Sequence, residues 1–185
     1  VVLARNVCDT NHGTTIAADG TSVSTIEHLM SALHGLGVDN AAVMVDGPEI
    51  PILDGSARLW VEKIKSVGLA VLEKERLYIT LPETVEWKDP DAGIVMTATP
   101  SDHFSVDCMI EFKSDLIGSQ QASIDSFENY SDDIARCRTF VFLHEVELLL
   151  AHNLIKGGDL DNALVFVDKP LGEEEKARLA TLFNK

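Results

Sequence analysis

One stretch of the sequence, STIEHLMSALHGLG at residues 24–37, predicts both the first helix and the first candidate for chemistry. Its apolar residues recur three and four positions apart, which is the spacing of one face of a helix. They are Ile26, Leu29, Met30 and Leu33. Ser24 and Glu27 have the S-x-x-E spacing of a capping box, and two glycines follow that can end the helix. We therefore expect a helix over residues 23–36.

The residues after this helix predict a buried strand, a rigid loop and a second helix. The apolar run at residues 41–45 is typical of a buried strand. The next stretch, GPEIPILDG at residues 47–55, holds two prolines, which cannot donate hydrogen bonds to a sheet, and it ends in an Asp-Gly turn. Ser56 can cap a helix that ends near Gly68. The apolar face of that helix consists of Ala57, Trp60, Val61 and Ile64.

The rest of the chain predicts antiparallel strands followed by helices. Strand patterns occupy residues 77–81, 94–99 and 104–112, and we expect the turns KDPDAG and PSDH to join these strands as an antiparallel meander. The last of these strands alternates strictly, so Val106, Cys108 and Ile110 should face the helices that cover the sheet. Further along the chain we expect helices over residues 131–136, 141–151 and 173–183, and a short strand over residues 163–167.

Together these elements predict an α+β fold of two-layer units, in which helices pack on one face of a sheet. A chain of 185 residues is long enough for one large domain or two small ones with buried cores. We place residues 1–74 in one domain and residues 75–185 in a second.

The charge and cysteine content argue against several classes of function. The 30 acidic residues exceed the 15 basic ones, and the net charge of −15 repels nucleic acids and anionic lipid surfaces. The three cysteines form no CxxC pair, which argues against a disulfide framework or a zinc finger and favours a reducing compartment. The sequence has no apolar run of the roughly 18 residues that a membrane span needs. We expect a cytoplasmic protein without nucleic-acid partners or stable membrane insertion.

The pair Glu27-His28, at the start of the first helix, is a candidate for hydrolytic zinc chemistry. An imidazole nitrogen is a good zinc ligand, and a neighbouring carboxylate can take a proton from water. Glu27 has a second interpretation as the capping-box partner of Ser24, and a lone histidine is more often a surface or core residue. Ala32 stands four residues after His28, so the HExxH motif of metalloproteases is absent.

Three other segments carry candidate groups with two interpretations each. The loop that contains Glu49 and Asp54 can line a site or simply connect a strand to a helix. Thr139, which we expect between two helices, can donate a hydrogen bond to an oxyanion or cap a helix. The KGG sequence at residues 156–158 can present backbone amides to an anion or end a helix.

Two longer strings resemble the signatures of one enzyme family. The first is STIEHLMSALHGLGVDNAAVMVDGPEIPILDGSA at residues 24–57, and the second is CRTFVFLHEVELLLAHNLIKGGDLDNALVFVD at residues 137–168. Both resemble UDP-3-O-acyl-N-acetylglucosamine deacetylase, the zinc enzyme of the committed step of lipid A synthesis. The string GGDLDNALVFVDKPLGEEE at residues 157–175 resembles the form of that enzyme fused to a hydroxyacyl carrier-protein dehydratase.

The resemblance implies a role for particular residues. Glu27 matches the general base, His28 the first zinc ligand, and Thr139 the residue that stabilises the oxyanion of the tetrahedral intermediate. Phe140 matches the aromatic residue beside the substrate sugar, and residues 142–167 match the insert that forms the apolar passage for the acyl chain. Within this insert we expect four residues to contact the substrate, namely Phe142, Val146, Ile155 and Gly158. The implied fold has two similar domains with helices sandwiched between sheets.

The sequence departs from the family pattern in its metal ligands. In the family the remaining zinc ligands come from an HxxxD motif and from a later histidine. The HxxxD spacing occurs here in His103 and Asp107, which we interpret as chance because a turn and a strand do not bring such residues onto one face. We therefore expect a chain truncated at both ends, with the other Zn²⁺ ligands beyond Lys185 and no activity in residues 1–185 alone.

The resemblance favours one partner and leaves two other functions open. The expected partner is a small-molecule acylated UDP-sugar. The first alternative is a non-catalytic module that binds a sugar nucleotide or an acyl chain on the same scaffold. The second is a structural protein, which a large exposed apolar patch would favour. Acyl-chain length and oligomeric state do not follow from the sequence.

Overall fold

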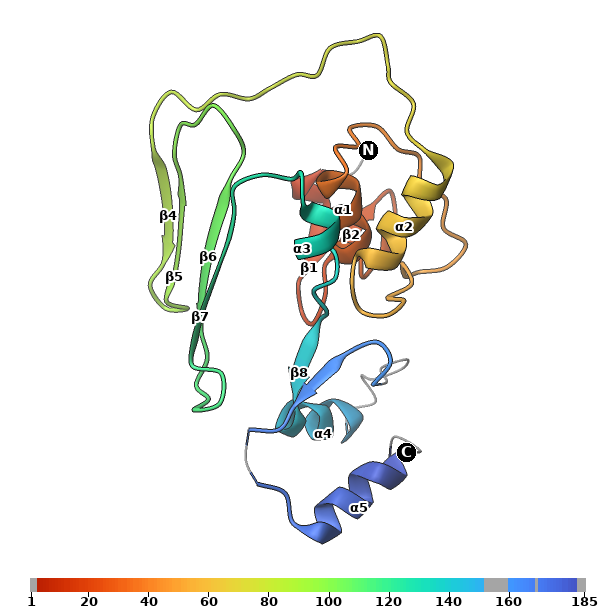
Figure 1. The fold of residues 1–185 in the computed structure, drawn as a ribbon, viewed down its shortest axis with the longest axis vertical. Coiled ribbons are helices and arrows are strands. Elements are labelled where there is room, and N and C mark those ends of the chain that lie inside the picture. Colours follow the sequence, from red (N-terminus) through yellow and green to blue (C-terminus); the bar gives the residue numbers. More distant parts are fainter. Residues whose placement is uncertain (1–2, 152–159, 169, 183–185) are drawn as a thin grey trace.

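The computed structural model describes residues 3–151, 160–168 and 170–182, and its helices and small sheets confirm the α+β class (Figure 1). The first half contains η1 (Ala4–Asn6), β1 (Val7–Asp9), β2 (Thr15–Ala18), β3 (Thr21–Val23), α1 (Glu27–Gly35) and α2 (Arg58–Val67). The second half contains β4 (Val85–Asp89), β5 (Ile94–Ala98), β6 (Val106–Glu111), β7 (Ser119–Ile124), α3 (Tyr130–Asp133), β8 (Phe140–Phe142), α4 (Leu143–Ala151), β9 (Leu164–Phe166) and α5 (Glu173–Leu182).

The strands β1, β2 and β3 form a small antiparallel sheet that leads directly into α1. The predicted capping box at the start of this helix is wrong, because α1 begins at Glu27 with Ile26 as its N-cap and without a side-chain cap. Thr25, just before the helix, has a φ of 58°, in the left-handed region that β-branched residues rarely adopt. The N-cap of α1 is Ile26, two residues after the predicted cap Ser24.

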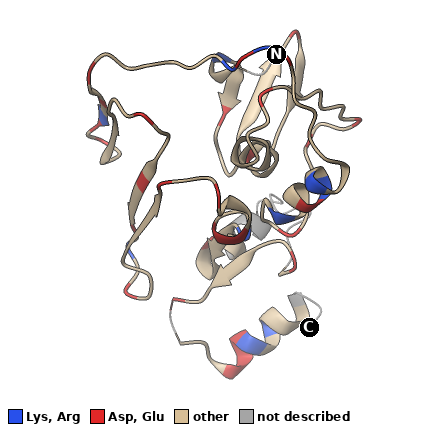
Figure 2. Cartoon of the chain, turned by 45° about the horizontal axis from the view of Figure 1, so that its top comes forward, with Lys and Arg blue, Asp and Glu red and all other residues tan. Residues whose placement is uncertain are grey.

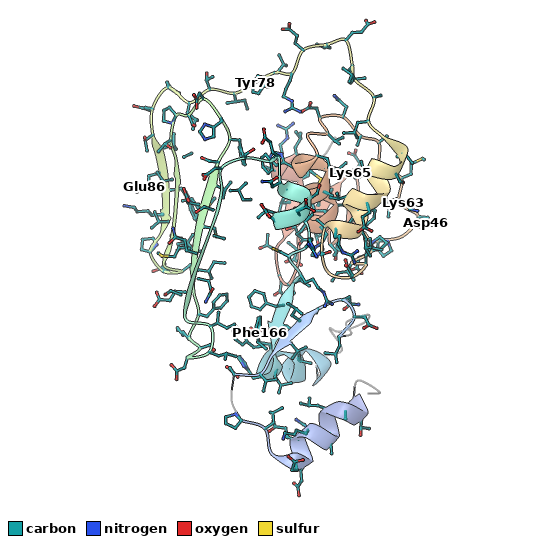
Figure 3. The ribbon with its side chains drawn as sticks, in the orientation of Figure 1. Asp46, Lys63, Lys65, Tyr78, Glu86 and Phe166 are labelled. Carbon is teal, nitrogen blue, oxygen red and sulfur yellow. The ribbon has the colours of Figure 1, made fainter. Side chains whose placement is uncertain are left out.

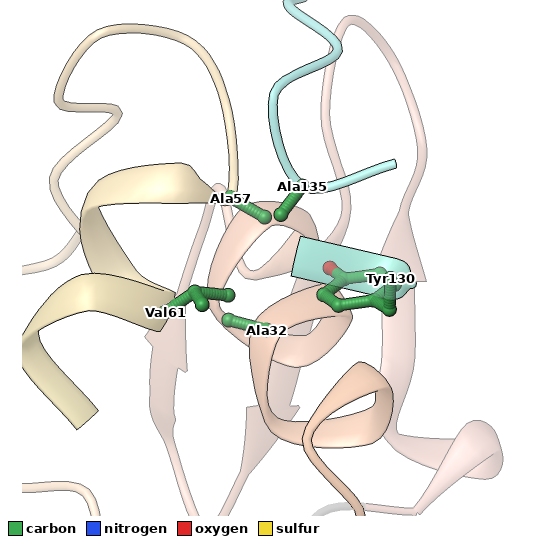
Figure 4. Close-up of a cluster of buried hydrophobic side chains, with 5 residues drawn as sticks. All are labelled: Ala32, Ala57, Val61, Tyr130 and Ala135. Carbon is green, nitrogen blue, oxygen red and sulfur yellow. The ribbon is translucent and has the colours of Figure 1, made fainter. Parts of the chain in front are cut away.

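The main core joins three helices (Figure 4). Ala32 of α1, Val61 of α2 and Tyr130 of α3 are buried against one another, and Ala57 and Ala135 complete the cluster. The predicted apolar face of α2 is therefore confirmed. Burying a side chain of valine size contributes about 1.5–3 kcal/mol, so this cluster holds α1 and α3 together although they are far apart in the sequence.

Two predicted strands are absent from the structure. Residues 41–45 have no regular structure and are exposed, with Met44 97% exposed. Residues 77–81 also lack a strand, and Tyr78 lies on the long extended segment between α2 and β4 (Figure 3). Both predictions relied on apolar content alone. A strand also needs a neighbour to pair with, and within the described residues no strand pairs with either run.

The middle of the chain forms two antiparallel hairpins, β4 with β5 and β6 with β7. The turn KDPDAG and the strands at residues 94–99 and 104–112 are confirmed, with slightly shorter bounds. The predicted meander is wrong, because β5 pairs with β4 and β6 pairs with β7, in separate sheets. The predicted packing is wrong, because β6 is exposed along its whole length, and no helix in the described part of the chain covers Val106, Cys108 and Ile110. A contact with α1 is made just before β6, where the centroid of the Phe104 ring lies 5.2 Å from that of the His34 ring.

The last part of the chain contains a strand–helix–strand unit and a terminal helix. β8 and β9 pair in parallel, which requires a crossover such as the one that contains α4. Thr139 therefore leads from α3 into a strand, and the prediction that it joins two helices is wrong. α5 is confirmed and has three glutamates in its first turn, which suits the positive end of the helix dipole (Figure 2).

In the described part of the chain, none of the helices has the length and apolar character to cross a membrane.

Candidate active site

The Glu27 side chain is held by the loop that precedes the small sheet's second strand. Its Oε1 accepts a hydrogen bond from the backbone amide of Thr14. Gly13 comes so close that a Cβ atom on it would lie 3.4 Å from the same carboxylate oxygen. No other hydrogen bond or ion pair joins this carboxylate to a described residue. One oxygen of Glu27 is therefore oriented by the backbone, while the other can accept a proton.

Ser24 and Thr25 attach the proline-containing loop to the start of α1. The Ser24 hydroxyl, predicted as a helix cap, donates to the Pro48 carbonyl at 3.3 Å, and the backbone of Ser24 bridges to Glu49 in parallel. The Thr25 hydroxyl donates to Glu49 Oε1 at 2.7 Å. The Ile50 amide donates to the Ser24 carbonyl at 3.0 Å. These bonds attach the loop to the two residues that precede Ile26 and Glu27.

The half-buried His28 imidazole follows Glu27 on α1, but the described residues do not complete a zinc site around it. No group of three His, Cys, Asp or Glu side chains converges anywhere in the described part of the chain. Catalytic zinc needs three protein ligands and prefers imidazole, thiolate and carboxylate donors. His28 fits one ligand position, so the residues described here do not fit a whole zinc site.

The HxxxD spacing at His103 and Asp107 does not create a second metal site. His103 Nδ1 lies 2.7 Å from Asp102 Oδ1, whereas Asp107 Oδ1 accepts a hydrogen bond of 2.5 Å from the Ser123 hydroxyl. The two side chains therefore have separate partners. This geometry supports the interpretation of the spacing as chance.

Thr139 lies between two segments that are distant from it in the sequence. Its amide donates to the Gly55 carbonyl at 2.7 Å, and its carbonyl accepts from the Leu164 amide at 3.0 Å. The half-buried Thr139 hydroxyl makes no hydrogen bond to another described residue. Because Thr139 immediately precedes β8 and caps neither α3 nor α4, the helix-cap interpretation is wrong. The hydroxyl is available as a donor.

Asp54 organises the turn that reaches Thr139. Its carboxylate accepts hydrogen bonds from the Ser56 hydroxyl at 2.8 Å and from Arg58 at 2.7 Å. Burial alone would raise the pKa of Asp54, but these bonds from Ser56 and Arg58 outweigh it and hold the pKa below its ordinary value. The Ser56 hydroxyl also accepts from the Arg58 amide at 3.1 Å. The N-cap of α2 is nevertheless Ala57, so the prediction that Ser56 caps this helix is wrong by one residue.

Arg138 is the functional candidate that sequence reasoning missed. Its Nε donates to the Asp54 carbonyl at 2.7 Å and a terminal nitrogen donates to the Leu160 carbonyl at 3.1 Å. The arginine was visible in the CRTF string, but its acceptors are backbone carbonyls, which carry no side-chain signal in the sequence. Only the tertiary structure reveals this contact.

The residues expected to contact the substrate fall into three groups. Phe140 is 40% exposed and belongs to a cluster of rings, with its centroid 5.2 Å from Phe166 and 5.5 Å from Phe112 (Figure 3). Phe142 and Val146 are buried, Val146 being only 2% exposed. Ile155 and Gly158 lie outside the described residues, as does the KGG sequence.

Comparisons with known proteins point to a single family. The family model described as UDP-3-O-acyl N-acetylglycosamine deacetylase matches residues 1–183. The chain is 46% identical over 180 residues to a "Bifunctional enzyme LpxC/FabZ" of Porphyromonas gingivalis, covering 97% of this chain and 39% of the relative. It is 42% identical over 181 residues to a "UDP-3-O-acyl-N-acetylglucosamine deacetylase" of Citrifermentans bemidjiense, covering 97% of this chain and 59% of the relative. The chain thus spans about two fifths to three fifths of the length of these relatives.

Proposed function

The chain belongs to the UDP-3-O-acyl N-acetylglycosamine deacetylase family, and we propose that it forms part of an enzyme that removes the N-acetyl group of UDP-3-O-acyl-N-acetylglucosamine in lipid A synthesis. The observation that carries this proposal is the Glu27 carboxylate, which is oriented by the Thr14 amide and stands next to His28. The family expectation from the two sequence signatures agrees with the comparisons.

In the proposed reaction, Glu27 accepts a proton from the water that attacks the acetamide carbonyl. The Thr139 hydroxyl donates a hydrogen bond to the carbonyl oxygen as that oxygen gains negative charge. His28 provides one nitrogen ligand for a zinc ion. When bound, zinc supplies Lewis acidity toward a carbonyl and toward water. Because the described residues offer one ligand position only, we assign no further step to the metal.

We propose further that the ring cluster of Phe140 and Phe142 lies beside the substrate, with the sugar near the more exposed Phe140. Val146 of α4 is buried, so we propose that it supports the acyl passage from the protein interior without being exposed to the acyl chain. The long exposed segment between α2 and β4 supports the proposed domain boundary near residue 74. The exposed thiols of Cys8, Cys108 and Cys137 suit a cytoplasmic location.

The test uses the full-length gene product and two substitutions. Glu27→Gln keeps an oxygen that can accept from the Thr14 amide but cannot take a proton, so kcat should fall by roughly a hundredfold or more while bound zinc is retained. His28→Ala should lose zinc as well as activity. Turnover is measured on UDP-3-O-acyl-N-acetylglucosamine, and zinc by metal analysis after dialysis.

His103→Gln is the matched control, because His103 has the HxxxD spacing but pairs with Asp102. It should leave zinc content and turnover unchanged. Near-normal rates in both Glu27→Gln and His28→Ala would refute the assignment. A full-length protein that binds the UDP-sugar without hydrolysing it would favour the non-catalytic binding module instead.

A further inference from the structure

The Arg138 side chain bridges two segments of the chain through their backbone carbonyls. Its Nε donates to Asp54 and a terminal nitrogen donates to Leu160, at 2.7 and 3.1 Å. A guanidinium is a rigid planar group with five N–H donors, so it can hold two acceptors at a set separation. A lysine ammonium at the end of a flexible chain cannot fix both carbonyls in the same way.

The two segments that Arg138 joins are the ones that hold the backbone of Thr139. The carbonyl after that of Asp54, on Gly55, accepts from the Thr139 amide at 2.7 Å. Four residues after Leu160, the Leu164 amide donates to the Thr139 carbonyl at 3.0 Å. The guanidinium therefore sets the relative position of both backbone partners of Thr139.

The position of the Thr139 backbone also governs its hydroxyl. A threonine side chain has a single torsion between its backbone and its hydroxyl oxygen, and branching at Cβ restricts that torsion. On the other side of Thr139, the methyl group approaches Gly55, where an added Cβ would come within 3.2 Å of it. Small shifts of the residue 54–55 turn would therefore move the hydroxyl.

We propose that Arg138 is a positioning residue that places the Thr139 hydroxyl for oxyanion stabilisation. This inference rests on the role of Thr139 in the proposed function. The two described hydrogen bonds of Arg138 go to backbone carbonyls of the chain, which is what a positioning role requires. An anion-binding role for the guanidinium, toward the diphosphate of the substrate, is the alternative that the test separates.

The experiment is a double-mutant cycle in the full-length gene product, with kcat and KM measured on UDP-3-O-acyl-N-acetylglucosamine. Thr139→Ala should lower kcat roughly a hundredfold, as expected for loss of one oxyanion donor. Arg138→Met should lower kcat by roughly ten- to a hundredfold with KM changed less than about threefold, because misplacement affects the transition state more than binding. In the Thr139→Ala background, Arg138→Met should cost less than about twofold more.

Two further variants separate positioning from folding. Arg136→Met removes an exposed arginine two residues away and should behave as wild type. Arg138→Lys should give a kcat between those of wild type and Arg138→Met, because an ammonium can reach one carbonyl but not span both. Circular dichroism and the thermal midpoint show which variants are folded. If Arg138→Met does not fold, Arg138→Lys replaces it in the double-mutant cycle.

The outcomes distinguish the two hypotheses. If Thr139→Ala is impaired while Arg138→Met keeps normal kcat, or if the two effects multiply, the positioning role is refuted and the proposed function stands. A raised KM with unchanged kcat would assign Arg138 to substrate binding and would also overturn positioning. If Thr139→Ala keeps normal kcat, the oxyanion role in the proposed function fails, and the positioning role fails with it.

Discussion

The amide of Thr139 donates a 2.7 Å hydrogen bond to the carbonyl of Gly55, which joins the start of β8 to the turn before α2. These two residues belong to the two separate sequence signatures. The contact places the proposed oxyanion donor beside a turn whose glycine has a φ of 77°. The turn can approach the backbone of Asn162 closely because Gly55 has no side chain, since a Cβ on Gly55 would clash with the Asn162 carbonyl oxygen.

Gly55→Ala should therefore destabilise the protein and displace Thr139. The substitution combines a clash with backbone atoms and a left-handed conformation, for which the strain alone costs about 1–3 kcal/mol. We expect a loss of at least about 2 kcal/mol in urea unfolding. Gly93→Ala is the control, because Gly93 also has positive φ but open space around it. Equal losses in the two variants would show that close approach at Gly55 is unimportant.

The lowered pKa of Asp54 predicts that the protein loses stability in acid. Its pKa is below the ordinary 3.8 in the folded state, so the unfolded chain binds the proton more readily. The stabilisation is therefore present above pH 3.8 and is lost as the pH falls through the folded pKa below that value. Asp54→Asn should reduce stability at pH 7 and flatten the stability profile below about pH 4. The profile is measured by urea unfolding, with exposed Asp91→Asn as the control; an unchanged acid slope in Asp54→Asn would contradict the argument.

Tyr130 ties α3 to α1 with a single hydrogen bond. Its hydroxyl lies 2.5 Å from the Ser31 hydroxyl in the core, and burial raises the pKa of the phenol. Tyr130→Phe should cost about 1 kcal/mol, because the Ser31 hydroxyl loses its buried partner. Tyr78→Phe changes the other tyrosine of the chain, which is exposed, and should cost less than about 0.5 kcal/mol. The stabilities of the two variants are compared by thermal and urea unfolding. Equal stabilities would show that the Tyr130–Ser31 hydrogen bond does not stabilise the protein.

The polypeptide of residues 1–185 should bind zinc at well below one equivalent. Catalytic zinc needs three protein ligands, and His28 alone has the family context for a ligand in this sequence. Metal analysis after dialysis, beside the full-length gene product, decides the matter. One tightly held equivalent that disappears in His28→Ala would show that these residues suffice for the site.

Signals that act within a few residues were sufficient to predict part of the fold. The predicted helix from Ser56 to Gly68 appears as α2, which begins at Arg58, because its apolar face and its glycine end are encoded locally. The acid-started helix α5 and the strand β9 also follow their predictions. The pairing of Glu27 with His28 is likewise visible in the sequence, since adjacent residues need no fold to bring them together.

The α+β class, most local elements and the family signatures follow from the amino-acid sequence, because propensity and turn chemistry depend on neighbouring residues. Burial depends on the folded chain, since the apolar residues of 41–45 and of β6 are exposed and no described helix covers them. The tertiary structure also decided the start of α1, where Glu49 holds Thr25 in its left-handed turn. The contacts around Thr139 also depend on the tertiary structure. Arg138 binds backbone carbonyl groups, which every residue possesses, and only folding determines which of them it contacts.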